Sequence, residues 1–180
     1  MKLIAHDHPG PGVTPAGGPD DCGTEALIEE LLALDLLTLR AHTEQAGDVW
    51  NEEQQRQTVT ASLLVSKLCT VRRSGKLVAY ARLHPTAQGV WFVSGFNTHP
   101  EHRTAPVLVD LFAQLSGVIE EAGACELRSH VYKTNRPSIN FHRRLGFEVA
   151  RENARALEFV ISAEALKASR AFLHKGSGRR

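Results

Sequence analysis

The stretch FNTHPEHRTAPVL, residues 96–108, contains the residue types of an anion-binding turn. A strand-like run leads into Arg103, which is followed by Thr104, a residue type that caps helices. The first N–H groups of a helix lack internal partners, and the helix dipole makes that end partly positive. A phosphate group suits such a position, and Arg103 would add a charge-assisted contact. Because most helix starts bind only water, the stretch alone leaves the choice open.

The histidines and cysteines do not form a metal-binding pattern. His6 and His8 have no third ligand nearby, which favours two surface histidines. Cys22, Cys69 and Cys125 are widely spaced without a CxxC pair, which predicts three reduced thiols. Cys69 and Cys125 lie in strand-like runs, so we expect both side chains to be buried.

Apolar periodicity predicts the elements that position these groups. A first helix runs from Thr24, a suitable cap, to Leu39, and Gly47 with Asp48 supplies the break and cap before a second. After the second helix (49–64), the expected elements are strands 66–73, 77–84 and 89–99, helix 108–122, strand 125–132, helix 137–145, strands 147–151 and 156–162, and helix 164–173. Short turns such as SGK predict an antiparallel meander for the first three strands. This order indicates an α/β (α+β) domain with a partly antiparallel sheet.

The ends of the later elements carry local signals. Gly123 is expected to end the helix before it, and Pro137 and Gly146 suit the first turn and the C-terminal cap of the short helix. The PTAQ segment should separate the second strand from the third, and a turn near Asn153 should join the last two.

Bulk properties limit the class of protein. The chain has 180 residues and a net charge of +1, which fits one domain and gives no electrostatic case for nucleic acid as a partner. No apolar run is long enough to span a bilayer, and the N-terminus lacks a signal-peptide pattern, so we expect a cytoplasmic protein. We expect a flexible proline- and glycine-rich arm (1–22), a folded domain (23–162) and a C-terminal helix and tail (163–180).

The run NRPSINFHRRLGF, residues 135–147, together with THPEHR at 98–103, resembles the GCN5-related N-acetyltransferase (GNAT) family. In that family a turn of the form V-x-P-x-[QR]-R leads into a helix that holds the pyrophosphate of acetyl-CoA. A second motif, N-x-x-[AS]-x-x-F-[YH]-x-x-x-G-F, comes from the next strand and helix. The resemblance covers residues 24–162. It implies a mixed, mostly antiparallel central sheet flanked by helices, with acetyl-CoA as co-substrate and no metal.

The resemblance also implies cofactor-binding residues. Asn135 corresponds to an asparagine near the pantetheine arm, and Ser138 to the small residue where the short helix approaches the cofactor. Phe96 and Thr98 would offer backbone groups to the pantetheine amides and the thioester carbonyl. The full implied set is Phe96, Thr98, Arg103, Thr104, Ala105, Pro106, Val107, Leu108, Asn135 and Ser138.

This sequence departs from the family in the phosphate turn. The family places glycines, or an alanine, where Pro106 and Leu108 stand here. Proline removes an N–H that could reach a phosphate oxygen, and Leu108 blocks a close approach to the backbone. The pyrophosphate would then depend more on Arg103 and on the amides of Thr104 and Ala105.

The catalytic groups differ as well. His142 stands where the family often has a tyrosine acid, and an imidazole can donate a proton near neutral pH. The alternative is that His142 is a partly exposed helix residue among arginines, with Tyr132 as the acid. The strand GVWFVSGFN lacks the carboxylate base that many members carry. His84, His99 and a water-mediated route stay open as the base.

The resemblance implies an acyl-CoA-dependent N-acetyltransferase that acts on a primary amine of a small molecule or protein. The lost glycines and the lost carboxylate leave two alternatives. One is a catalytically idle acyl-CoA-binding or protein-interaction module, and the other is an enzyme that uses a different thioester. The expected partners are an acyl-CoA and an amine acceptor, without nucleic acid or membrane. A homodimer is common in the family, but the sequence does not fix the oligomeric state.

Overall fold

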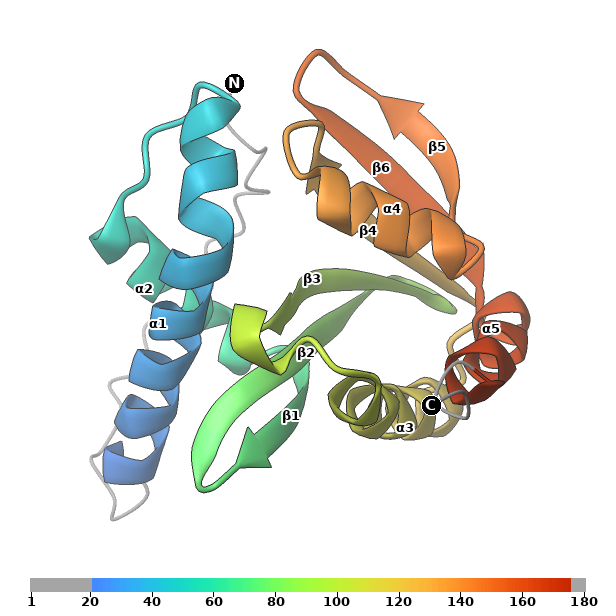
Figure 1. Ribbon diagram of the computed structural model, residues 1–180, viewed down its shortest axis with the longest axis horizontal. Helices are drawn as coiled ribbons and strands as arrows, with labels where there is room; N and C mark the ends of the chain where they lie inside the picture. The colour runs from blue at the N-terminus through green and yellow to red at the C-terminus, as the bar shows by residue number, and fades with distance from the viewer. Residues whose placement is uncertain (1–20, 176–180) are drawn as a thin grey trace.

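A computed structural model describes residues 21–175, so the His6 and His8 pair and most of the predicted N-terminal arm lie outside it. The helices and strands follow the predicted order (Figure 1). They are α1 (Asp21–Gln45), α2 (Glu52–Leu63), β1 (Lys67–Arg73), β2 (Lys76–Ala87), β3 (Val90–Thr98), η1 (Pro100–His102), α3 (Ala105–Glu121), β4 (Glu126–Tyr132), α4 (Arg136–Arg144), β5 (Glu148–Glu152), β6 (Ala156–Ser162) and α5 (Ala163–Lys175).

The strands form one six-stranded sheet in the order β1-β2-β3-β4-β6-β5. The first three strands are an antiparallel meander, as predicted. β3 and β4 pair in parallel across the α3 crossover, whereas β6 pairs antiparallel with both β4 and β5. The prediction of a mixed, mostly antiparallel sheet flanked by helices is therefore confirmed.

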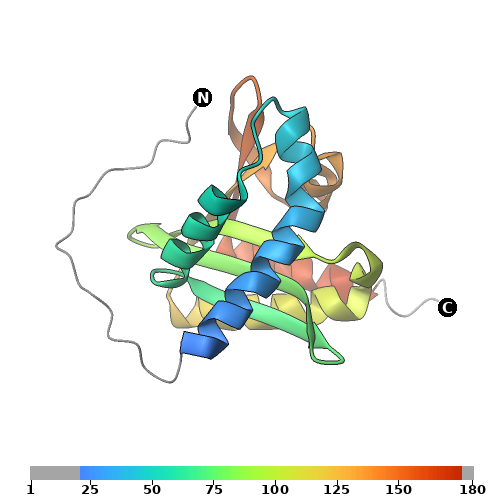
Figure 2. The same cartoon turned by 90° about the vertical axis from the view of Figure 1, so that its left-hand side faces the viewer.

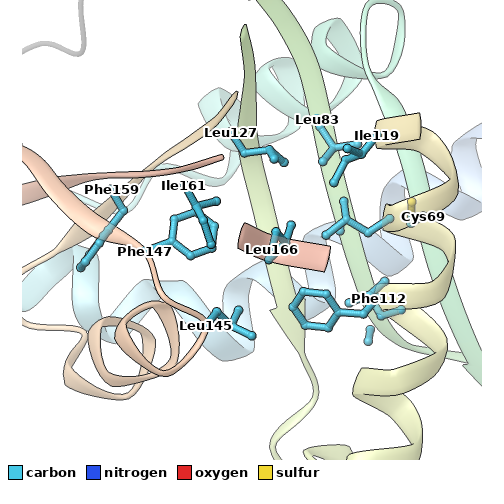
Figure 3. Packing of buried hydrophobic residues seen from close by; sticks show 14 of the residues in the cluster. Cys69, Leu83, Phe112, Ile119, Leu127, Leu145, Phe147, Phe159, Ile161 and Leu166 are labelled. Atoms are coloured by element: carbon cyan, nitrogen blue, oxygen red, sulfur yellow. The ribbon is translucent and has the colours of Figure 1, made fainter. Parts of the chain in front are cut away.

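Helices cover both faces of the sheet (Figures 1 and 2). α1 and α2 lie over β1–β3, and α3 and α5 lie on the opposite face. Two apolar cores result. The smaller core joins α1 and α2 to Leu77 and Tyr80 of β2. The larger core fills the other face and includes Phe112, Leu127 and Phe159 (Figure 3).

Helix ends agree with the sequence signals in the second half of the chain and differ in the first. Pro137 lies in the first turn of α4, and Gly146 follows its C-cap with φ of 85°. Thr24 is not a cap, because α1 already begins at Asp21. The cap of α2 is Asn51 rather than Asp48, and its side chain accepts the Gln54 N–H at 2.8 Å.

Two further expectations need correction. Cys125 is exposed, because it lies in the turn before β4, where its N–H donates to the Gly89 carbonyl at 2.7 Å. Cys69 is buried as expected, and burial raises the pKa of its thiol to about 11. The PTAQ segment does not separate two strands, since β2 continues to Ala87. Within residues 21–175, no helix combines the length and the apolar character that a membrane crossing requires.

Candidate active site

β3 and β4 separate halfway along their length. They pair in parallel from Val90–Val93 to Glu126–Ser129, but β3 continues to Thr98 and β4 to Tyr132 without a ladder between them. Figure 1 shows the two strands together at one end and apart at the other. The register of β2 with β3 shifts at the same point, so that Ser94 is an extra residue opposite Arg82. Such a bulge bends a strand, which accounts for the separation.

The separated part of β3 offers backbone groups at its open edge. The His99 N–H donates to the Val78 carbonyl of β2 at 2.8 Å. Because backbone groups of successive strand residues alternate between the two edges, those of Phe96 and Thr98 face away from β2, toward β4. The Phe96 ring packs against Phe112, with ring centroids 5.5 Å apart, on the α3 side of the sheet. This is the arrangement that the predicted role of Phe96 and Thr98 requires.

The N-terminus of α3 is open, as the predicted phosphate turn requires. The first helical bond runs from the Leu108 N–H to the Thr104 carbonyl at 3.1 Å, so the N–H groups of Ala105 and Val107 precede it. The Thr104 side chain makes no capping hydrogen bond. Pro106, in the first turn, has no N–H to offer. Two amides are therefore available, fewer than a turn without proline would give.

Arg103 supplies the charge at this turn. Its side chain is anchored by the Nε–H, which donates to the Thr98 carbonyl at 3.3 Å. The guanidinium thus lies between the end of β3 and the start of α3, and the residue is exposed. A guanidinium beside free helix amides fits an anion such as a pyrophosphate.

Asn135 and Ser138 lie at the start of α4. Asn135 is the N-cap of that helix, and its Oδ1 accepts the Ser138 N–H at 3.1 Å. This contact fixes the first turn of α4, and the Ser138 side chain is half-buried. Asn135 therefore has a structural task whether or not it also contacts a ligand.

His142 is buried rather than partly exposed. Its ring stacks on Phe159 at 4.8 Å and meets Phe147 edge-on at 4.9 Å. Nδ1 lies 2.8 Å from the Ser138 carbonyl, which can only accept, so Nδ1 carries the proton and Nε2 accepts from the Ser129 hydroxyl at 2.9 Å. Burial lowers the pKa of His142, against a smaller opposing effect of the Ser138 carbonyl. A neutral imidazole with both nitrogens occupied is poorly suited to donate a proton.

Tyr132 ends β4 on the opposite face of the sheet. Its hydroxyl donates to Asp48 Oδ2 at 3.0 Å, and Asp48 also forms an ion pair with Arg155. Burial, followed by the contact with Asp48, raises the pKa of the Tyr132 phenol. The phenol therefore keeps its proton at neutral pH. Asp48 therefore joins the α1–α2 connection to the end of β4 and to the turn before β6.

The predicted bases lie in different places. His99 lies at the predicted phosphate turn, where its ring centroid is 5.4 Å from that of His102 and its Nδ1 accepts the Glu101 N–H at 3.3 Å. His84 lies on β2 beside Phe92, with ring centroids 5.7 Å apart. Burial, followed by the charge of Arg82, lowers the pKa of His84.

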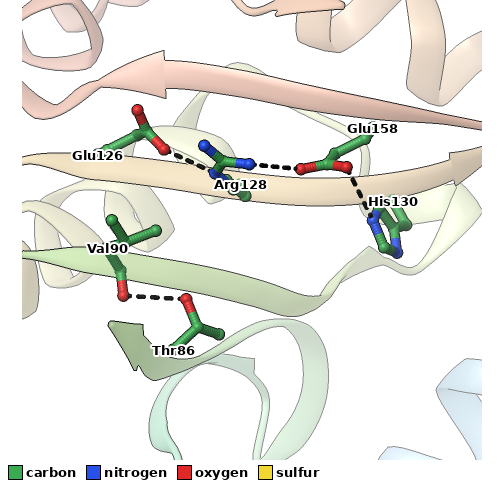
Figure 4. A network of polar contacts seen from close by, with 6 residues as sticks. All are labelled: Thr86, Val90, Glu126, Arg128, His130 and Glu158. Atoms are coloured by element: carbon green, nitrogen blue, oxygen red, sulfur yellow. Dashed lines mark hydrogen bonds and ion pairs between the residues drawn. The ribbon is translucent and has the colours of Figure 1, made fainter. Parts of the chain in front are cut away.

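The sequence analysis missed a charged row on β4 and β6 (Figure 4). Arg128 contacts Glu126 at 2.6 Å and Glu158 at 2.8 Å, and Glu158 lies 3.8 Å from His130. These side chains belong to the face of the sheet that also carries Tyr132, because Ser129 and Val131 between them are buried on the other face. Only the pairing of β4 with β6 brings Glu158 to Arg128 and His130.

A second missed feature is a buried polar network between α1 and the sheet. The Asp35 carboxylate, fully buried, accepts from the Tyr80 hydroxyl, from Asn97 Nδ2 at 2.7 Å and from Gln55 Nε2 at 2.8 Å. Burial raises the pKa of Asp35 and is also the main cause of the raised pKa of Tyr80. The sequence signal was a single acid inside the apolar run LLALDLLTL. Because Asn97 belongs to the separated part of β3, the network holds that segment to α1.

Arg82 extends this network. It is 3 % exposed, its Nε–H donates to the Ser94 hydroxyl at 3.2 Å, and its Nη1 lacks a partner among the described residues. The guanidinium is thus held at the bulge where β3 turns away from β4. No group of His, Cys, Asp and Glu side chains within residues 21–175 is arranged to hold a metal ion.

Comparison with known families gives a match across most of the domain. The model of the acetyltransferase (GNAT) family matches residues 29–147. A search of curated proteins gives no match.

Solved structures with the same fold have little sequence identity to this chain. PaiA N-acetyltransferase from Thermoplasma acidophilum, in complex with coenzyme A, has 14% identity and a TM-score of 0.60 over 76% of this chain and 93% of its own. An aminoglycoside 6'-N-acetyltransferase complexed with coenzyme A has 12% identity and a TM-score of 0.63, covering 79% and 94%. The ribosomal-protein-alanine N-acetyltransferase from Brucella melitensis has 20% identity and a TM-score of 0.55, covering 77% and 95%.

Proposed function

Because the chain belongs to the acetyltransferase (GNAT) family, we propose that it transfers an acetyl group from acetyl-CoA to a primary amine of a small molecule or protein. The observation that carries this proposal is the separation of β3 and β4 beside the open start of α3. A strand edge without a neighbouring strand suits the amides of a pantetheine arm. A helix start with an adjacent arginine suits the pyrophosphate.

The residues that would hold acetyl-CoA lie along this path. The backbone groups of Phe96 and Thr98 face the open edge, and Asn135 and Ser138 begin the helix that follows β4. Arg103, Thr104 and the amides of Ala105 and Val107 would hold the pyrophosphate, with Pro106 and Leu108 shaping the turn in place of glycines. When bound, acetyl-CoA supplies the activated acetyl group as a thioester.

Of the two candidate acids, the contacts favour Tyr132 over His142. Tyr132 is half-buried and keeps its proton because its pKa is raised, whereas His142 is enclosed by Phe147 and Phe159 with a lowered pKa. Tyr132 would give its proton to the leaving thiolate and recover one from solvent. His142 would stabilise the packing of α4 on β4 and β6.

Two measurements test the proposed function. Calorimetric titration with acetyl-CoA should show binding. Release of free thiol should then depend on an added amine, tested with spermidine, kanamycin and a peptide with a free N-terminal alanine. Binding without thiol release from any amine would contradict the transferase and support an idle acyl-CoA-binding module. Preferential binding of longer acyl-CoAs would contradict acetyl-CoA as the donor.

A further inference from the structure

We propose that His130, which lies beside Glu158, is the general base that takes the proton from the acceptor amine, an assignment that rests on the proposed acetyl transfer. For this task the sequence analysis left open His84, His99 and a water-mediated route. The structure places His130 at the point where β4 loses its β3 partner. The assignment depends on its position, its carboxylate partner and its accessibility.

The position follows from the strand pairings. Ser129 is the last β4 residue paired with β3, so His130 is the first residue beyond the junction. Its side chain lies on the face away from the larger core, because its neighbours Ser129 and Val131 are buried there. The side chain is 46% exposed, so an amine in solution can reach it.

The carboxylate partner is fixed by the sheet. Glu158 is directly opposite His130 in the β4–β6 register, with Oε2 3.8 Å from Nε2. Glu158 is itself held by Arg128 at 2.8 Å, and its side chain is only 15% exposed (Figure 4). A carboxylate on the Nε2 side favours the tautomer with a proton on Nε2. That tautomer leaves Nδ1 free to accept a proton, and Nδ1 has no hydrogen-bond partner among the described residues.

An aromatic neighbour limits the motion of the ring. Phe92 meets His130 edge-on, with centroids 4.9 Å apart, and has His84 on another side at 5.7 Å. The charged and titratable groups that face His130 are Glu158 from β6, Arg128 from β4 and, across Phe92, His84 from β2. The other two histidines are less suitable. Burial, followed by the charge of Arg82, lowers the pKa of His84, and His99 lies at the predicted phosphate turn.

The proton transfers balance as follows. His130 Nδ1 takes one proton from the ammonium form of the acceptor, so that the freed nitrogen lone pair can attack the thioester carbonyl carbon. The new C–N bond forms, the C–S bond breaks, and the leaving thiolate receives the proton of Tyr132. The acylated nitrogen then loses its second proton to solvent, which leaves a neutral amide. His130 and Tyr132 are two residues apart on β4, so base and acid lie on the same side of the sheet. The rise along the strand separates them by roughly 7 Å. The exposed imidazolium then returns its proton to solvent.

The test uses the full chain and the best amine of the panel. His130→Gln should lower kcat/KM by roughly 100-fold or more at neutral pH and remove the acid limb of the pH–rate profile. Added imidazole should restore activity to His130→Ala. Glu158→Gln should lower kcat, but less than His130→Gln does. Glu126→Gln, which removes the other carboxylate that contacts Arg128, should keep the wild-type pH profile. Calorimetric binding of acetyl-CoA should be unchanged in all four variants.

A readout without substrate complements the kinetics. Nitrogen-15 NMR of the free protein should show neutral His130 with its proton on Nε2, and Glu158→Gln should weaken that preference. Three results would overturn the assignment while acetyl transfer stands. They are wild-type activity in both His130 variants, loss of the acid limb of the pH–rate profile in His84→Gln instead of His130→Gln, and a neutral His130 with its proton on Nδ1. Absence of any wild-type turnover would overturn the proposed function, and His130 as its base with it.

Discussion

Gly95 of β3 lies directly against the ring of Tyr80. A Cβ atom on Gly95 would come within 2.7 Å of Tyr80 Cε2, closer than real Cβ atoms approach. The Tyr80 side chain is 1% exposed, and its hydroxyl is bonded to Asp35, so the ring has no room to move. The glycine inside this strand is therefore required by the buried network.

Gly95→Ala should lower the free energy of unfolding by about 1–3 kcal/mol, since overpacking displaces a buried ring. The matched control is Gly117→Ala in α3, where an added Cβ meets nothing within 4 Å. The control should be neutral or more stable by up to about 1 kcal/mol, because alanine favours a helix over glycine. Urea denaturation measures both. Equal stability of the two variants would contradict this role of Gly95.

Asp35 should make stability depend on pH in an unusual direction for an acid. Its pKa is raised by burial, so the folded state binds its proton more tightly than the unfolded state. Raising the pH from about 4 to about 7 should therefore destabilise wild type relative to Asp35→Asn, which does not titrate. Urea denaturation of both proteins across this range measures the difference. A difference that moves the opposite way would mean that Arg82 and the three donors outweigh the cost of burial.

Tyr132→Phe should lower kcat by roughly 100-fold, because the thiolate loses its proton donor, while acetyl-CoA affinity stays unchanged. Asp48→Ala is the control, because it removes the carboxylate that accepts from the Tyr132 hydroxyl at 3.0 Å and keeps the hydroxyl itself. Steady-state kinetics and calorimetry measure both variants. An equal loss of kcat in Asp48→Ala would assign the effect to the contact rather than to the proton.

His142 should influence stability at acid pH. Its pKa is lowered by burial, so on acidification the unfolded state takes up the proton first, and stability falls below about pH 6.5. His142→Gln should lack this part of the acid loss and should keep the wild-type pH dependence of kcat. Denaturation curves and kinetics between about pH 5 and 8 measure both. Loss of a catalytic limb in this variant would restore His142 as the acid.

Arg103→Ala should weaken acetyl-CoA binding by roughly 10–100-fold, the range expected for a hydrogen bond to a charged group. S-acetylpantetheine, which lacks the pyrophosphate, should bind both proteins equally. Arg40→Ala, which removes an exposed arginine of α1, controls for net charge. Calorimetry measures the binding of both ligands to wild type and to the two variants. An equal loss for S-acetylpantetheine would place Arg103 away from the phosphates.

The fold could be predicted because each element carries its own local signal. Apolar periodicity located the helices and strands, and turn residues such as Gly123 and Gly146 marked their ends. The errors were local too. Thr24 resembles a cap but lies inside a helix that starts earlier, and Cys125 follows a strand-like pattern but belongs to a turn. In both cases the local residue pattern did not show where the element begins.

The site was harder to predict because it depends on contacts between distant segments. His130 and Glu158 meet only because β6 inserts between β4 and β5, which no short stretch of sequence specifies. His142 lies between the rings of Phe147 and Phe159, but Arg143 and Arg144, which follow it in the sequence, suggested an exposed side chain. The phosphate turn could be predicted because its residues are contiguous in the sequence.

The most direct test of acetyl transfer is detection of the product. The wild-type protein is incubated with acetyl-CoA labelled in the acetyl group and with each amine of the panel, and the mixture is analysed by mass spectrometry and NMR. We predict a labelled amide on the acceptor nitrogen, formed in a one-to-one ratio with free thiol and formed much more slowly by His130→Gln. Thiol release without a labelled amide, or no reaction with any amine despite acetyl-CoA binding, would contradict the account.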